Sequence, residues 1–216
     1  MRAKWAVVGL LAVLAFAPAA GATVIVDNFG PGDTFRTEIG WWVGGPYGYL
    51  EGEAFVVPGT TDYHLDSISL AFTSYDDPST VDLRVCLTSA CAPGQVLETF
   101  RFDTAPRDDS QYPAVFPPLV VLPSTLRPQL EGGQQYWLIA TGPADGNGSI
   151  WYHALDDMSR PHAINYTGGF LHESTTYSGA FRVTGDPVPE TGSLLLLGSG
   201  LVGLAARRRR AARSRS

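Results

Sequence analysis

The 216-residue chain has one lysine, Lys4, and only two cysteines and two methionines. Between Thr23 and Glu190 it has seven arginines, no lysine and 21 acidic residues, so this body carries a net charge of −14. Nucleic acids and anionic lipid surfaces are bound by clustered Lys and Arg, which this body lacks. The composition therefore excludes DNA and RNA as partners.

The sequence also lacks the motifs of common catalytic sites. Its four histidines show no H-E-x-x-H spacing, and there is no G-x-S-x-G elbow and no phosphate-binding glycine loop. Oxygen-bearing residues crowd the stretch from Asp27 to Asp33, where a loose calcium site is an alternative to a simple turn. We expect a protein that is not an enzyme, with no cofactor and no metal.

Long apolar runs are missing too, and the first short one looks like an export signal. Arg2 and Lys4 precede an apolar run over residues 5–16, and small residues follow at 20–22. This order is typical of a cleavable signal peptide, predicted here as a helix within residues 1–22. A retained anchor is the alternative, but twelve residues span only about 18 Å as a helix against a hydrocarbon core of ~30 Å.

Helical periodicity is absent from the body, and alternation takes its place. In residues 81–87, Val81, Leu83 and Val85 alternate with polar residues, and other short runs rich in β-branched or aromatic residues are bounded by Gly, Pro, Asp or Asn. Many short strands with turn signals predict an all-β fold. We expect one two-sheet antiparallel β-sandwich, jelly-roll-like, over residues 23–185.

The two cysteines lie close together, at Cys86 and Cys91. An exported chain meets an oxidising compartment, and four intervening residues can form a tight turn, so we predict a disulfide. Two free thiols and half of a metal site are the alternatives, although no second ligand pair completes a zinc set.

Several stretches of the body resemble a known family. The segments "FGPGDTFRTEIGWWVGG", "LDSISLAF", "CAPGQVLETF", "LEGGQQYWLIATGP", "IWYH" and "GAFRVTG" are similar to bacterial exported choice-of-anchor domains. The resemblance implies a β-sandwich followed by a C-terminal sorting signal, and it implies no catalytic residue.

The C-terminus has three physical parts. Pro187 and Pro189 hold an extended linker, predicted over residues 186–192, that a processing enzyme can grip. Residues 193–206 are uncharged and include six leucines, which predicts a short transmembrane helix of about 21 Å. The arginine-rich tail, residues 207–216, would stay cytoplasmic and stop transfer through Arg207, Arg208, Arg209 and Arg210.

This three-part tail resembles the PEP-CTERM sorting signal of Gram-negative bacteria. By that resemblance Val188, Pro189 and Glu190 form the recognition motif, and an exosortase is the membrane enzyme that processes it. Thr191 departs from the pattern, which usually has a second proline there. Two alternatives remain: "VPETG" also resembles the LPxTG signal of a sortase, and the helix could be a membrane anchor that is never cut.

A cluster of aromatic residues among glycines suggests a binding surface. Trp41, Trp42, Tyr47 and Tyr49 lie in "GWWVGGPYGYLEG", and adjacent residues of a strand point to opposite faces. One tryptophan could therefore stack on a sugar, while packing in and beside the core is the simpler alternative.

Together these patterns predict an exported, non-catalytic protein of the cell envelope or the extracellular matrix. It would be tethered to the inner membrane through its C-terminal helix until the exosortase processes it, and would then stay in the envelope, at the cell surface or outside the cell. The alternative is a carbohydrate-binding or adhesive module, with an extracellular polysaccharide as its partner.

Overall fold

The computed structural model describes residues 21–46, 48–74, 77–106, 119–144, 147–155, 160–165, 172–174 and 177–189. Within these ranges every ladder between strands is antiparallel, and the one short helical turn is η1 (Pro93–Gln95). The all-β, antiparallel fold class expected from the alternating pattern is confirmed.

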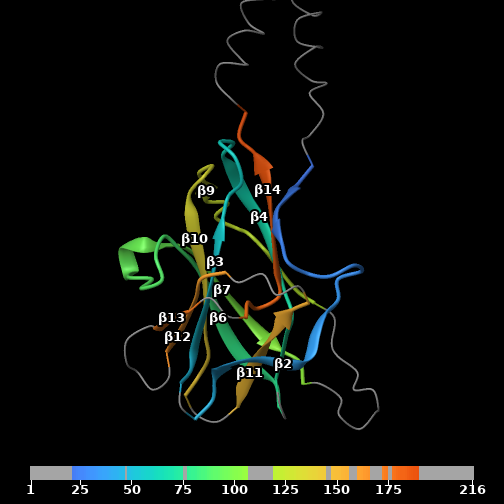
Figure 1. Ribbon diagram of the computed structural model, residues 1–216. Helices are drawn as coiled ribbons and strands as arrows, with labels where there is room; N and C mark the ends of the chain where they lie inside the picture. Colours follow the sequence, from blue (N-terminus) through green and yellow to red (C-terminus); the bar gives the residue numbers. More distant parts are fainter. Residues whose placement is uncertain are drawn as a thin grey trace, which may run out of the picture.

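The strands form three hydrogen-bonded sheets (Figure 1). The first sheet contains β1 (Thr23–Asp27), β14 (Phe181–Pro187), β4 (Tyr63–Leu70) and β8 (Val120–Pro123) in that order, with β9 (Gln129–Leu130) also paired to β4. The second has the order β13 (His172–Ser174), β12 (His162–Asn165), β3 (Leu50–Val56), β10 (Gln135–Thr141), β6 (Ser79–Cys86) and β7 (Val96–Thr104). The third has the order β2 (Phe35–Gly44), β11 (Gly148–Ala154) and β5 (Phe72–Ser74).

The expectation of two sheets is corrected by this pattern, because one layer is divided. At Ala71 the chain passes from β4 to β5 and changes partners: the Ala71 amide donates to Ala180 O (3.2 Å), and the Tyr152 amide donates to Ala71 O (2.9 Å). The two smaller sheets are therefore linked through Ala71 and Ala180 into one layer, and the six-stranded sheet forms the other.

The main core lies between these two layers. Strand β6 contributes Val81, Leu83 and Val85, which are fully buried and alternate with half-exposed residues. Across the core, Trp151 of β11 and Phe181 of β14 are also fully buried. Period-2 alternation thus directs one face of each strand into a shared interior, as the sequence pattern predicted.

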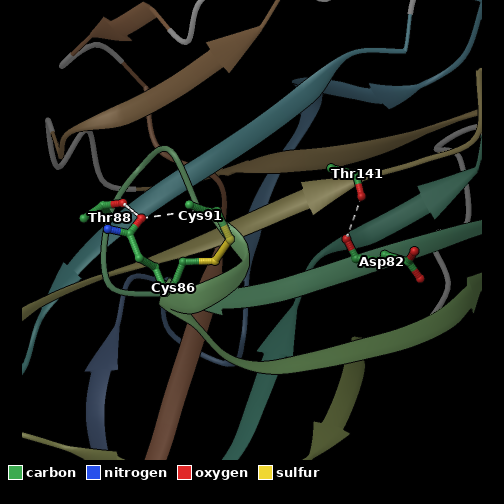
Figure 2. The surroundings of a disulfide bond; sticks show 7 residues. Asp82, Cys86, Thr88, Cys91 and Thr141 are labelled. Atoms are coloured by element: carbon green, nitrogen blue, oxygen red, sulfur yellow. Dashed lines mark hydrogen bonds between the residues drawn. A yellow bond between two sulfur atoms is a disulfide. The ribbon is translucent and has the colours of Figure 1, made fainter.

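The Cys86–Cys91 disulfide expected from the spacing is confirmed, with the two Cα atoms 5.3 Å apart. Figure 2 shows it closing the loop that follows β6, where the Cys91 amide also donates to Thr88 O at 3.1 Å. Both cysteines are buried and pack with Trp137 of β10 in a cluster on the outer face of the six-stranded sheet. The bridge therefore fixes a loop that helps to cover a large apolar side chain.

Candidate functional site

The candidate processing site begins where the last strand ends. Pro187 still pairs with Tyr63, and the Val188 amide donates a 2.8 Å hydrogen bond to Asp62 O. The Asp62 side chain also accepts from Gln129 and from the Gly132 amide, which joins three segments at this point. The segment expected as a linker from residue 186 is extended, but its first two residues belong to β14.

Two arginines fasten β14 to its neighbours. Arg127 pairs with Asp186 near the end of the strand and with Asp66 at 3.5 Å. These contacts are substantially exposed, so each one adds little to stability by itself. Their geometry nevertheless fixes the strand end that continues into the tail.

At the start of β14, Arg182 contacts Asp27 at 2.7 Å and Asp33 at 2.5 Å. The Asn28 side chain, which lies between them in sequence, bonds to Ser178, to Gly179 O and to the Phe181 amide. The oxygens of Asp27, Asn28 and Asp33, the calcium-binding alternative for this turn, thus contact Arg182 and the backbone.

Both described ends of the body lie at the same end of the sandwich. Thr23, the first residue of β1, pairs with Gly185 near the end of β14. Figure 1 shows β1 and β14 leaving the fold side by side at the top of the view. A membrane-directed segment on either end would therefore emerge from the same pole.

Most of the predicted tail lies outside the described residues. Val188 is half-buried and Pro189 is exposed, which makes them the two described members of the predicted motif. Glu190, Arg207, Arg208, Arg209, Arg210 and the predicted helices within 1–22 and over 193–206 are outside the description. In the parts that the structure does describe, no helix has the length and apolar character needed to span a bilayer.

The paired tryptophans point to opposite faces of β2, as extended neighbours must. Trp41 faces the interior and donates a 3.3 Å hydrogen bond from Nε1 to Tyr177 O, while Trp42 is 42 % exposed on the outer face. Tyr49 closes the turn after β2 through two backbone bonds with Gly44 and is half-buried. Tyr47 lies outside the described residues.

Sequence reasoning missed a buried polar cluster that includes Trp41. Its ring centroid lies 4.9 Å from that of His153 and 5.2 Å from that of His162. Beneath these rings β3 directs Glu51 and Glu53 inward, and only 2 % and 1 % of these residues are exposed. Phe55, which follows on the same face, enters the main core, so its apolar side chain was the sequence signal that this face points inward.

The two glutamates have strongly altered acid–base properties. Burial, together with a smaller effect of the nearby Glu53, raises the pKa of Glu51 to about 9. Burial also raises the pKa of Glu53 well above its usual range, although the hydrogen bond from the Gly179 amide (2.5 Å) and the charge of Arg160 act in the opposite direction. Burial therefore favours the protonated form of both carboxyl groups.

A third buried glutamate organises a loop that precedes the strand-end site. Glu98 of β7 accepts hydrogen bonds from the amides of Thr125 (2.8 Å) and Leu126 (3.1 Å) and from the hydroxyl groups of Ser124 and Thr125. This loop leads directly to Arg127. Glu98 is thus a structural residue that positions the arginine next to β14.

Metal-ligand geometry is not found in the described part of the chain, where no three His, Cys, Asp or Glu side chains are grouped to hold an ion. The side chain of His172 is among those the structure leaves undescribed, and His64 lies at the surface with Nδ1 3.2 Å from Arg127 O.

Comparison with known proteins identifies the tail. The model of the PEP-CTERM protein-sorting motif matches residues 187–210, beginning at the last residue of β14. No curated protein matches the chain significantly. The match favours the exosortase interpretation of the tail over the sortase interpretation. The chain therefore carries a PEP-CTERM protein-sorting motif, the C-terminal signal of an exosortase substrate.

Proposed function

We propose that this chain is a non-catalytic protein of the cell envelope or the extracellular matrix, exported by its N-terminal signal and processed by an exosortase. Residues 193–206 hold it in the inner membrane as a transmembrane helix, and Arg207 to Arg210 stop transfer on the cytoplasmic side. Processing then leaves the β-sandwich in the envelope, at the cell surface or outside the cell.

The observation that carries this proposal is the direct junction between the fold and the sorting motif. The matched segment starts at Pro187, which still pairs with Tyr63, so the motif follows the body with no intervening spacer. Since β1 leaves from the same pole, export through the N-terminus and tethering through the C-terminus place the same end of the sandwich towards the membrane.

Intact mass spectrometry of the mature protein tests the proposal. In cells that contain the exosortase, we expect a product without the signal peptide and without the segment that follows the motif. Cells from which the exosortase has been removed should retain the C-terminal segment in the membrane fraction.

Replacement of the motif acid gives a second test. Glu190→Ala should reduce processing at least tenfold, because the variant lacks the carboxylate that the motif presents at the membrane surface. Glu131→Ala, at an exposed glutamate of the body, is the matched control. Equal processing of Glu190→Ala and the parent protein would remove the role assigned to this residue.

A second candidate function is carbohydrate binding at the outer face of β2. The exposed Trp42 favours it, since a flat aromatic ring open to solvent can stack on a sugar. Gly148 leaves room for this ring, because a Cβ there would lie 3.1 Å from Trp42 Cε3. Figure 1 shows β2 and β11 at the end of the sandwich away from the tether.

Glycan binding by the parent and by Trp42→Ala tests this second function. Selective loss of binding in the variant, with retention in Tyr177→Ala at another exposed aromatic residue, would support it. A parent protein that binds no polysaccharide would eliminate it and leave the sorting proposal unaffected.

A further inference from the structure

A cavity lies between β1 and β3, lined by residues of both strands and by Arg160 and Pro161. It has a volume of about 450 Å³ and is not part of the processing site. Val26, Phe55, Val56 and Pro161 give it apolar walls, and Arg160 lines it as well. Small-molecule sites are typically apolar clefts of about 300–1,000 Å³ with a few placed polar groups.

Arg160 is an unusual group to find in such a place. Its side chain is half-buried, with the guanidinium carbon 5.7 Å from the centroid of the Phe181 ring. Within the part of the chain that the structure describes, its guanidinium has no hydrogen bond and no ion pair. A guanidinium carries five N–H donors, so an anion in the groove can accept hydrogen bonds from Arg160.

The acids that the structure describes near this cation make no hydrogen bond or ion pair with it. Asp27 also lines the cavity, but its carboxylate contacts Arg182 at 2.7 Å. Glu53 lies near Arg160, and burial raises the pKa of this glutamate, although the charge of Arg160 acts in the opposite direction. Burial lowers the pKa of Arg160, and the charge of Glu53 raises it. The acids described around the groove thus leave the N–H donors of Arg160 open to an anion.

We propose that this groove binds an amphipathic monocarboxylate, with the carboxylate on Arg160 and the apolar part against Phe55 and Val56. A planar guanidinium matches a carboxylate through two parallel hydrogen bonds. One cation balances one negative charge, which favours a carboxylate over a doubly charged phosphate. The apolar walls favour an aliphatic or aromatic chain over a free sugar.

Hexanoate and its neutral analogue hexanamide are suitable probes, and acetate tests the need for the apolar part. Titration calorimetry on the full-length chain in maltoside micelles, with a micelle-only blank, measures binding of each. We expect hexanoate to bind at least tenfold more tightly than hexanamide, and acetate to bind at least tenfold more weakly than hexanoate.

Two substitutions locate the site. Arg160→Met should remove the preference for hexanoate over hexanamide, whereas Arg101→Gln, at an exposed arginine on β7, should keep it. Val56→Asp adds a repelling charge at the mouth of the groove and should weaken hexanoate binding at least fivefold. Val121→Asp is its matched control, since Val121 is also an exposed strand valine, on β8.

Val56→Asp and its control Val121→Asp keep the test valid if Arg160→Met fails to fold. Val56 is 49 % exposed, so its replacement leaves the core intact. A further pair, an N-acetylated apolar dipeptide as free acid and as amide, distinguishes a peptide C-terminus from an acyl chain. Equal binding of hexanoate and hexanamide, or hexanoate binding unaltered by Val56→Asp, would overturn the proposal. Neither result bears on exosortase processing.

Discussion

At the scale of single residues, the least expected feature is the pair of glutamates inside the sandwich. Glu51 and Glu53 alternate with Gly52 and Ala54 on β3, and their side chains share the inner face with Phe55. Each has a buried Oε2 atom without a hydrogen-bond partner among the described residues. A buried carboxylate is costly unless it is protonated or paired, and the raised pKa values express that cost.

This cost gives a pH-dependent prediction for Glu51→Gln. Folding raises the pKa of Glu51 from 4.5 to about 9, so the native state takes up a proton between these pH values. Wild-type stability should therefore fall as the pH rises through this window. At pH 7 the wild-type protein must protonate the buried carboxyl group in order to fold, and the neutral amide of the variant avoids this cost. The free energy of unfolding should therefore rise by up to about 3 kcal/mol, at ~1.4 kcal/mol per pKa unit.

Urea unfolding of both proteins at pH 4 and at pH 7 measures the effect. The variant should be the more stable protein at pH 7, and the difference should nearly vanish at pH 4, where both states of the wild type are protonated. Glu131→Gln, at an exposed position, serves as the control. A stability difference that is independent of pH would contradict the protonated state assigned to Glu51.

At the scale of elements, the loop from Cys86 to Cys91 acts as a cover on the sheet. The disulfide holds it over the outer face of β10, where Trp137 is only 3 % exposed although it points away from the main core. Gln95 also binds this loop, with Oε1 accepting from the Thr88 hydroxyl at 2.5 Å and from the Ala92 amide at 3.3 Å. A short loop thereby buries a side chain that the sheet alone would expose.

We expect Cys86→Ala/Cys91→Ala to lower the free energy of unfolding by about 2 kcal/mol, the chain-entropy value for so short a loop. The loop should also loosen over Trp137, which would shift part of the tryptophan emission to longer wavelength. Fluorescence and urea unfolding of the variant and the oxidised parent measure both effects. A stability loss with unchanged emission would show that the disulfide does not maintain this cover.

At the scale of the whole molecule, the two described ends of the body share one pole, because Thr23 pairs with Gly185. Strand β14 spans about 20 Å from Phe181 to Pro187 at ~3.3 Å per residue, and it separates this pole from the pole that carries β2 and β11. In the proposed arrangement the first of these poles faces the membrane and the exosortase. Strand β2, which carries Trp42, lies at the opposite pole.

Because the sorting motif directly follows β14, we expect a spacer between them to change the rate of processing. Insertion of a six-residue Gly-Ser spacer between Pro187 and Val188 should increase the rate of exosortase processing, because it separates the motif from the Asp62 contact and from the folded body. Pulse-chase analysis of the full-length protein in exosortase-containing cells measures the rate.

The same spacer placed in the exposed turn at Gly94, between β6 and β7, is the control and should leave the rate unchanged. Slower processing with the tail spacer would indicate instead that the folded body presents the motif to the enzyme. In either case the role proposed for Glu190 is tested separately, by Glu190→Ala.

Much of the architecture could be predicted from local patterns. Alternation identified the strands around Val81, Leu83 and Val85 because sheet side chains repeat every two residues. The break at Ala71 was not predictable in the same way, since it depends on a change of partner from β14 to β11, which are distant in sequence. The pattern predicts strands but does not determine their pairing.

The candidate sites also differ in whether the sequence alone could predict them. The sorting signal was identified from the sequence because a signal of this kind is read as an extended segment, so its chemistry lies in consecutive residues such as Val188, Pro189 and Glu190. The Glu51–Glu53 cluster and the groove at Arg160 each combine strands and loops that lie far apart in the chain, and only the packed layers bring them together.

The sequence by itself determined that the protein has an acidic all-β body and a PEP-CTERM tail, because these properties depend on composition, local periodicity or consecutive residues. Only the tertiary structure decided which strands pair, that both described ends of the body leave from one pole, that two glutamates are buried, and that Arg160 lines an apolar groove. These features depend on contacts between distant segments, and such contacts form only when the two layers close over their common core.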